Sequence, residues 1–256
     1  MKSLAKKYGC NLEQKQLLSR IEDLADLAEK RDRPRCMGFL TPAEQLFLLK
    51  ITELNDICRL EFDGGYPQAE RKLAVVKPQY ECEEIQLPIS ILAVECRERV
   101  GHRDILGSVM ALGIKRDRVG DILDRCTPPI FICDSGIAPL ITAELNRVGR
   151  LKVRVHSTII EDIPDPQIVI RTATVASLRL DSIVAEGFKM SRVKAASLIK
   201  SGAACLNWVP CDNVSSSVTE GDKISLRGYG KIELKEIGSN SKKGRTFVTI
   251  AKYGDI

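Results

Sequence analysis

Residues 191–202 read SRVKAASLIKSG, a segment in which both the ends and the charges carry structural information. Ser191 can accept a hydrogen bond from a free amide at the start of a helix, and Gly202 can adopt the left-handed conformation that ends one. Between them, apolar residues recur at helical spacing, and Val193 and Ile199 are predicted to lie on the packed face. The segment is therefore predicted to form a short amphipathic helix.

The charges around this helix have one sign. Residues 187–211 contain four basic residues and no acidic residue. Solvated helices usually mix the two signs, so cations alone beside a tight turn favour a surface that faces phosphates. The spacing by itself is equally compatible with a solvated face. The four cations are Lys189, Arg192, Lys194 and Lys200.

The composition sets wider limits. The chain has 256 residues, enough for two or three domains, and its 39 Lys and Arg against 34 Asp and Glu give a net charge of +5. This balance suits a nucleic-acid-binding protein and suits many enzymes equally. The position of the charges is therefore more informative than their sum.

The cysteines indicate the compartment. Nine cysteines occur without a CxxC pair, and only two histidines are available as further ligands, which argues against a zinc module. An odd count in a chain that begins without a signal peptide indicates reduced, mostly buried thiols in the cytoplasm. No apolar run reaches transmembrane length. We expect a cytoplasmic protein with no metal, no cofactor and no membrane partner.

The first third, residues 1–84, is predicted to be an α/β region. Helical periodicity covers 11–30, and a second helix is expected over 43–54. Thr41 and Pro42 supply an N-cap and a proline at the first helical position.

A glycine pair follows a short predicted strand in the same region. Gly64-Gly65 is predicted to form a tight turn, although its free amides could also bind an anion. Pro67 is expected to open a helical turn toward Arg71. Glu70 and Arg71 are predicted to hold the domain together and not to perform chemistry.

The middle third, residues 85–163, has a regular order of elements. Strands are expected over 87–96, 119–123, 128–134 and 151–160, and helices over 102–114 and 138–148. This βαββαβ order predicts a ferredoxin-like plait, the plan that RRM domains share. Among the aromatics, only Phe131 falls on a central strand, so the chemistry does not support an RRM-type RNA-reading sheet.

One loop of this domain is basic. The segment GIKRDRVGD, residues 113–121, places Lys115, Arg116 and Arg118 between flanking glycines. Clustered cations between glycines suit phosphate contact, and an ordinary solvated loop is the alternative.

The last third, residues 168–256, follows the two prolines of IPDPQ at 163–167. A strand-like run, QIVIRTATV, is expected to lead into two helices. A turn at Glu186-Gly187 separates these helices, and short strands follow. The helices are expected over 178–185 and 191–201, and the strands over 204–206, 223–226 and the alternating tail.

The sequence gives little support for catalysis. There is no Ser/His/Asp order, no paired-carboxylate motif and no phosphate-binding P-loop. HRD at 102–104 matches the kinase catalytic loop by accident, since the glycine-rich loop and DFG are missing. His102 and His156 are predicted to be structural.

Several motifs in a fixed order resemble a known family. The C-terminal motifs resemble the S4-type RNA-binding domain, and NW followed by RGYGK is similar to the variant in the YlmH family. The resemblance covers about Phe39 to Tyr253. The motifs are FLTPAEQ (39–45), FDGGYPQAERK (62–72), HRDILGSVMALGIKRDRVGDIL (102–123), RLD (179–181), SRVKAASLIKSGAACLNW (191–208) and VTEGDKISLRGYGKIEL (218–234).

The resemblance implies an RNA-binding protein with an S4 (αL-type) domain that grips structured rRNA or tRNA. Members of this family are associated with the large ribosomal subunit and the rescue of stalled translation, and some are linked to cell division. Cyanobacterial and plastid relatives are named for photosystem function. The RNA-contact candidates carried over are Arg179, Lys189, Ser191, Arg192, Lys194 and Lys200, with the backbone near Asn207-Trp208 as a weaker addition.

RLD also leaves an enzymatic alternative. Pseudouridine synthases, which often carry S4 domains, use an aspartate in such a motif, so an RNA-modifying enzyme is the alternative function. Here Asp181 falls inside the first predicted S4 helix and is expected to form an ion pair with a nearby basic side chain. A protein-interaction scaffold is a third possibility. The favoured reading is an α+β, non-enzymatic RNA-binding factor.

Overall fold

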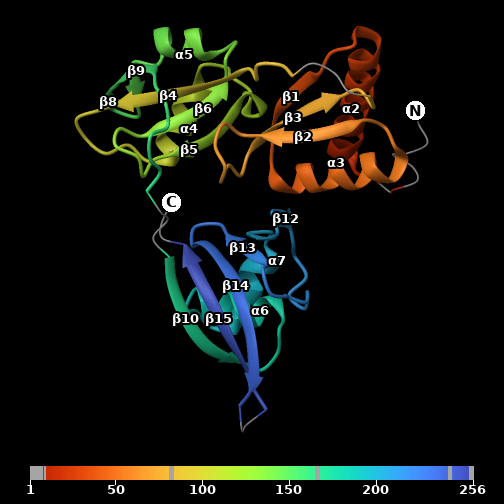
Figure 1. Ribbon diagram of the computed structural model, residues 1–256. Helices are drawn as coiled ribbons and strands as arrows, with labels where there is room; N and C mark the ends of the chain where they lie inside the picture. Colours follow the sequence, from red (N-terminus) through yellow and green to blue (C-terminus); the bar gives the residue numbers. More distant parts are fainter. Residues whose placement is uncertain (1–7, 9, 81–83, 165–167, 242–243, 254–256) are drawn as a thin grey trace. The chain divides into compact units, whose positions relative to one another are not determined.

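The computed structural model describes residues 8, 10–80, 84–164, 168–241 and 244–253. Contacts divide the chain into two compact units, Met1–Pro164 and Asp165–Ile256 (Figure 1). Both units combine helices with antiparallel sheets, so the protein is of the α+β class. The division falls within the proline-containing segment 163–167, and the N-terminal region and the central βαββαβ region lie in the same unit.

The N-terminal part of the first unit is a three-stranded antiparallel sheet, ordered β1-β3-β2, with two helices packed on it. Both helices start where the sequence predicts, because Asn11 and Thr41 each form a capping box. Their elements are α2 (Leu12–Arg31), β1 (Arg35–Leu40), α3 (Pro42–Asn55), β2 (Arg59–Asp63) and β3 (Lys72–Lys77).

Strands β1 and β3 were not expected from the sequence. Five of the six residues of β3 are buried, so this central strand lacks the alternation of apolar and polar residues that marks a half-exposed strand. The helical turn expected from Pro67 is wrong. The chain makes a simple turn at 67–68 and enters β3 at Lys72.

The second part of this unit has the predicted βαββαβ order, and its four strands are arranged β5-β6-β4-β9. The helix expected over 138–148 ends at Glu144, because Leu145, with ψ of 83°, leaves the helical conformation. The chain then forms a separate two-stranded hairpin, in which Gly149, with φ of 60°, makes the turn. The elements are β4 (Ile89–Glu95), α4 (His102–Ala111), the 3₁₀ turn η1 (Arg116–Arg118), β5 (Val119–Leu123), β6 (Ile130–Asp134), α5 (Ala138–Glu144), β7 (Arg147–Val148), β8 (Leu151–Lys152) and β9 (Arg154–Ser157).

Both faces of the four-stranded sheet are covered. One face packs against α4 and α5, and Phe131 is fully buried there, so it cannot stack on a base. The other face packs against the N-terminal part, where Ile132 contacts Phe39 and Leu73. Tyr66, Ile160 and Ile163 complete this cover. The sheet face that an RRM domain offers to RNA is therefore closed in this unit.

Asp121 on β5 joins the two parts of the first unit. Its carboxylate accepts hydrogen bonds from the Tyr66 hydroxyl at 2.8 Å and from the Glu70 and Arg71 amides at 2.7 and 3.0 Å. The Arg71 guanidinium donates to the carbonyls of Phe39 at 2.7 Å and of Val119 at 3.2 Å. Arg71 and the Glu70 backbone thus hold the domain together as predicted.

The C-terminal unit is a six-stranded antiparallel sheet, ordered β10-β15-β14-β13-β11-β12, with two helices packed on it. Gly187 allows close contact, because a Cβ there would lie 2.4 Å from Ile232 Cδ1. The elements are β10 (Ile168–Val175), α6 (Leu180–Gly187), α7 (Arg192–Lys200), β11 (Ala204–Leu206), β12 (Val209–Pro210), β13 (Lys223–Leu226), β14 (Gly230–Asn240) and β15 (Thr246–Tyr253).

We predict that Asp121→Asn loosens the first unit. The asparagine side chain carries no charge, and its NH2 group would face one of the donors that the carboxylate accepts from. We expect a loss of about 2 kcal/mol of stability, which raises the equilibrium constant for opening of this unit about 30-fold. Hydrogen–deuterium exchange of the β3 and β5 amides in the full chain should accelerate accordingly. Asp23→Asn, at an exposed position on α2, is the matched control, and equal exchange in the two variants would contradict the prediction.

Candidate nucleic-acid interface

The corner between α6 and α7 carries exposed cations from both sides of the turn. Lys189 follows α6 in the left-handed conformation, with φ of 53°, and its side chain is exposed. Ser191 caps α7, its hydroxyl accepting a hydrogen bond from the Lys194 amide at 3.2 Å. Gly202, with φ of 73°, follows the other end of the helix, so both predicted caps are confirmed.

The predicted packed face of α7 needs one correction. Val193 is 82% exposed, because the buried stripe of this helix runs through Ala195 and Ile199, one turn apart. Val193 therefore lies among the exposed cations Arg192 and Lys194. An apolar side chain at this position adds contact area to the corner without charge.

Asp181 of α6 forms two ion pairs, one with Arg192 of α7 and one with Arg179, the residue that precedes α6. One carboxylate oxygen accepts a hydrogen bond from Arg192 Nη2 at 2.6 Å, and the other is 3.3 Å from Arg179 Nε. The Asp181 side chain is only 8% exposed, whereas those of Arg179 and Arg192 are 42% and 53% exposed. Each guanidinium is thus fixed on one side and open to solvent on the other.

The protonation of Asp181 follows from this geometry. Burial by itself would raise the pKa of the carboxyl, but the hydrogen bonds and charges of Arg192 and Arg179 lower the pKa below its ordinary value. Asp181 is therefore ionised at neutral pH. Its ion pairs with two arginine side chains confirm the predicted pairing of the RLD aspartate with a basic residue.

A basic hollow of ≈ 470 Å³ lies beside this corner. Arg171 of β10 and Arg245, which follows Gly244 before β15, line it together with Lys189 and Arg192, and Glu186 is the one acidic side chain in its lining. Arg245 is oriented by Thr174, whose hydroxyl accepts from its Nε at 3.2 Å. Four cations against one carboxylate give a site suited to phosphate oxygens.

Aromatic rings alternate with lysines next to the helices. Lys194 Nζ lies 5.3 Å from the centre of the Tyr229 ring, and Tyr229 packs edge-on against Phe188 at 6.1 Å. Lys252 Nζ lies 5.8 Å from the Phe188 ring. The cations are thus held over rings by cation–π attraction. Phe188 is buried, so the half-buried Tyr229 is the ring of this pair that a base could reach.

A second aromatic group surrounds the only tryptophan. Lys223 and Lys231 lie 5.3 and 5.6 Å from the Trp208 ring, and Lys231 is also 5.4 Å from the Tyr253 ring. Trp208 projects from the β11–β12 turn, where Asn207 and Trp208 have φ of 50° and 64°. The Asn207 amide donates to Asp222 at 2.7 Å, and its oxygen accepts from the Lys223 amide at 2.9 Å, so Asn207 shapes this turn.

Lys200 lies apart from the α6–α7 corner. It is exposed in the last turn of α7, roughly 13 Å along the helix axis from the Ser191 cap.

The predicted basic loop lies in the other unit and is largely engaged within it. Arg116 donates to the Val119 carbonyl and, at 3.2 Å, to the Gly120 carbonyl, while burial and then the neighbouring charge of Arg71 lower its pKa to about 10. Arg118 pairs with Asp134 at 2.8 Å. Lys115 is the exposed member of the three.

The sequence did not indicate several of the basic and aromatic residues of the C-terminal unit. Antiparallel pairing places Lys231 opposite Tyr253, and the turns bring Tyr229 and Arg245 to the helices from distant parts of the chain. RGYGK was the available signal, since it puts Tyr229 and Lys231 in a glycine-rich turn. The missed residues are Arg171, Lys223, Tyr229, Lys231, Arg245, Lys252 and Tyr253.

Metal and membrane sites can be assessed within the described ranges. There, no group of three or more His, Cys, Asp and Glu side chains is placed to hold a metal ion. None of the helices in the described part of the chain is long and apolar enough to cross a membrane. The eight described cysteines are free thiols, four of them buried, and Cys82 lies outside the described residues.

Comparisons with known proteins place the chain in a family. Residues 86–162 match the family model described as "Putative RNA-binding domain in YlmH". The chain is 34% identical over 232 residues to "Ribosome-associated protein quality control protein P2" of Bacillus subtilis (strain 168), a match that covers 88% of this chain and 90% of that protein. The chain belongs to the YlmH family.

A solved structure is also similar. "Cell division protein ylmH from Streptococcus pneumoniae" superposes with a TM-score of 0.53 over 60% of this chain and 96% of that one, at 17% identity. At this identity the match bears on the fold alone.

We predict that Asp181→Asn destabilises the C-terminal unit at pH 7 by about 2 kcal/mol, since two charge-assisted hydrogen bonds are lost. The folded-state pKa of Asp181 is lowered, so its contribution is fully present above the unfolded-state value of about 3.9 and is lost as the pH falls through the folded-state value. The difference between wild type and variant, measured by denaturant unfolding, should shrink toward pH 2. Asp212→Asn, exposed in the same unit, is the control; a gap independent of pH would contradict this assignment.

Proposed function

We propose that this protein is a non-enzymatic RNA-binding factor. Its C-terminal unit, over 168–256, acts as an S4 domain of the αL type, and its first unit combines an α/β region over 1–84 with a ferredoxin-like plait over 85–163. The ligand is structured rRNA or tRNA on the large ribosomal subunit, in the cytoplasm. The process is ribosome quality control, for which the name of the B. subtilis relative provides the support.

The observation that carries the proposal is the convergence of four cationic side chains on one hollow at the α6–α7 corner. Cations outnumber carboxylates in the lining, where Glu186 is the one acidic residue, and Asp181 engages only one side of Arg192. Phosphate oxygens are the ligand that best satisfies such an excess of guanidinium and ammonium groups. The Asp181 ion pairs support the same role, because they hold Arg179 and Arg192 in place before RNA arrives. Such fixed side chains lose little conformational entropy on binding.

The proposed contacts divide by chemistry. Lys189, Arg192 and Lys194 meet phosphates at the corner, with Arg179 and Ser191 beside them. Trp208 and its lysines offer a stacking surface, which is sequence-tolerant. Lys200 and the Asn207 backbone are outlying contacts, and in the first unit Lys115 is the free member of the loop with Arg116 and Arg118.

The enzymatic alternative has less support. Asp181 would have to approach a base, whereas its carboxylate is buried and bonded to two guanidinium groups. The printed names of the relatives describe RNA binding, ribosome association and cell division, and none names a catalytic activity.

We expect the double variant Lys189→Gln/Lys194→Gln to bind deproteinised large-subunit rRNA with a shallower salt dependence. Each lost phosphate contact lowers the slope of log K against log salt by about 0.7 to 0.9, so the slope should fall by about 1.4 to 1.8. Fluorescence anisotropy of labelled RNA over a salt series measures this. Lys15→Gln/Lys50→Gln removes two exposed charges from α2 and α3 as a control. If both variants keep the wild-type slope, the corner does not bind RNA.

Trp208 provides a second test, because it is the single tryptophan of the chain. Stacking of a base on the indole should quench its emission during an rRNA titration, with the same midpoint as the anisotropy. Trp208→Ala should weaken binding by about 1 to 3 kcal/mol, the usual contribution of one stacked base. Saturated binding with unchanged emission would remove Trp208 from the interface.

A further inference from the structure

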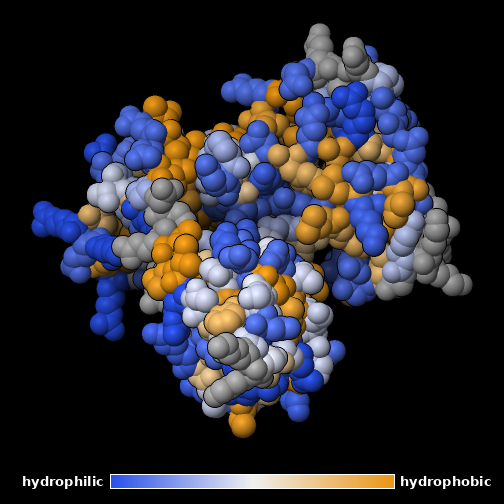
Figure 2. Space-filling model, turned by 60° about the horizontal axis from the view of Figure 1, so that its bottom comes forward, coloured by the Kyte–Doolittle hydropathy of each residue, from blue (hydrophilic) through white to orange (hydrophobic). Residues whose placement is uncertain are grey.

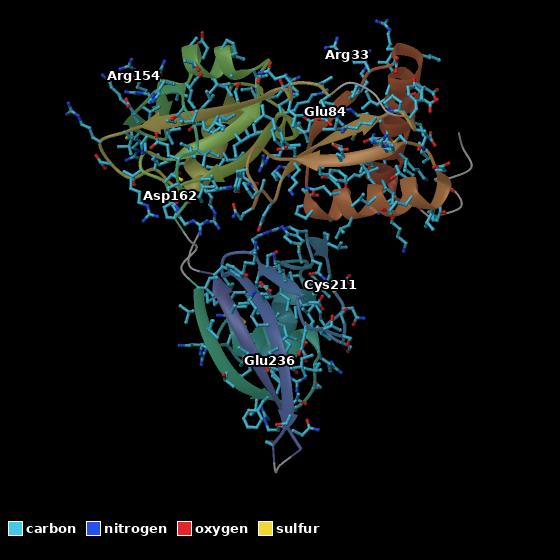
Figure 3. The ribbon with its side chains drawn as sticks, viewed as in Figure 1. Arg33, Glu84, Arg154, Asp162, Cys211 and Glu236 are labelled. Atoms are coloured by element: carbon cyan, nitrogen blue, oxygen red, sulfur yellow. The ribbon has the colours of Figure 1, made fainter. Side chains whose placement is uncertain are left out.

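A second basic surface lies on the first unit, at the β7–β8 hairpin and the start of β9. The segment 145–160 contains four cations and no acidic residue. All four side chains are exposed. Figure 2 shows strongly hydrophilic side chains projecting from the edge of this unit that carries β8 and β9, and Figure 3 labels Arg154 on the same edge. The cations are Arg147, Arg150, Lys152 and Arg154.

The fold separates these cations from the core. Val148, Val155 and the partly buried Leu151 and Val153 pack into the hydrophobic cluster beneath α4 and α5. The basic residues alternate with them and therefore project outward. The hairpin is held to neighbouring segments by backbone atoms, since the Gly149 amide donates to the Ser108 hydroxyl at 3.4 Å.

The arrangement of charge on the hairpin is unfavourable in the free protein. Arg147 and Lys152 are directly opposite each other in the β7–β8 ladder, and like charges at such positions repel. Among the described residues, Glu95 is the carboxylate nearest in register, opposite Arg154, and it also lies 3.9 Å from His156. An anion that bridges the hairpin cations would remove this repulsion.

We infer that the β7–β8 hairpin and Arg154 bind the phosphate backbone of the same RNA ligand as the C-terminal unit. This inference rests on the proposed function. The sheet face normally used for RNA in a βαββαβ domain is closed by Phe39, Leu73 and Ile160. The matched family model over 86–162 nevertheless carries RNA binding in its description, and the hairpin lies within that range.

The chemistry of the hairpin favours RNA over a protein partner. Its exposed side chains are guanidinium and ammonium groups, and the large apolar residues of the described segment 145–155 are buried or half-buried. A surface without exposed apolar or aromatic groups makes phosphate contacts and does not read bases. The contacts should therefore be independent of RNA sequence and strongly dependent on salt.

The test uses the full chain and deproteinised large-subunit rRNA as probe. Arg150→Gln/Lys152→Gln/Arg154→Gln should lower the salt slope by about 2 to 3 and weaken binding at least about tenfold at physiological salt. A charge-matched control, Lys30→Gln/Arg31→Gln/Arg33→Gln, removes three exposed cations of the same unit that are interspersed with acids. Arg147→Lys/Arg150→Lys/Arg154→Lys keeps the charges and should keep the wild-type slope. Hydrogen exchange of the β9 amides verifies that each variant is folded.

Parallel titration of Lys189→Gln/Lys194→Gln separates the two proposals. If the slope of log K against log salt becomes shallower in both the hairpin and the corner variants, both surfaces are supported. A hairpin variant that matches its control while the corner variant loses slope overturns the hairpin inference and leaves the proposed function intact. The reverse result keeps the hairpin and overturns the corner. If the hairpin variant loses binding to poly-L-glutamate but not to rRNA, the surface recognises acidic protein, and the inference is wrong.

Discussion

The ion pairs of Asp181 determine how the C-terminal unit presents charge. The nearly buried carboxylate of Asp181 remains ionised because Arg192 and Arg179 donate hydrogen bonds to it and offset its charge. The Arg192 contact joins α6 to α7, and the two contacts together hold two guanidinium groups at the surface. The interaction that stabilises the contact between the helices therefore also positions two cations that we propose to contact RNA.

The sheet supplies the rest of that surface. Strands β13 to β15 bring Lys223, Lys231 and Tyr253 together on the sheet, and the turn at Tyr229 places an aromatic ring beneath Lys194. Lysines held over rings are partly ordered before any ligand binds. The C-terminal unit thus places ordered cations beside aromatic rings, the two components found in proteins that bind RNA strands.

The first unit is organised around a different carboxylate. Asp121 and Arg71 hold the three-stranded sheet against the four-stranded one, and this packing covers the sheet face that would otherwise be open. Tyr66, whose hydroxyl donates to Asp121, stays protonated, since burial and then the charge of Asp121 raise its pKa. With its sheet closed on both sides, this unit leaves its basic edges as the surfaces suited to a polyanion.

Local signals predicted much of this structure. Capping residues such as Thr41 and Ser191 predicted where helices begin. The position of Asp181 on a predicted helix indicated that it pairs with a nearby basic side chain, as it does. Strand β3 escaped prediction because burial on both faces removes the alternating pattern. The hollow also escaped, because Arg171 and Arg245 meet Lys189 only after the sheet has formed. Val193 was misplaced, since the periodicity of a nine-residue helix does not fix which side is buried.

Ultraviolet crosslinking of the full chain to deproteinised large-subunit rRNA, with mass spectrometry of the RNA-bearing peptides, tests the central claim most directly. The claim is that cations fixed by Asp181 at the α6–α7 corner meet RNA. Crosslinked peptides should include residues 188–194 and the turns that carry Trp208 and Tyr229. Crosslinks that occur only in the first unit, with none in residues 168–253, would contradict it.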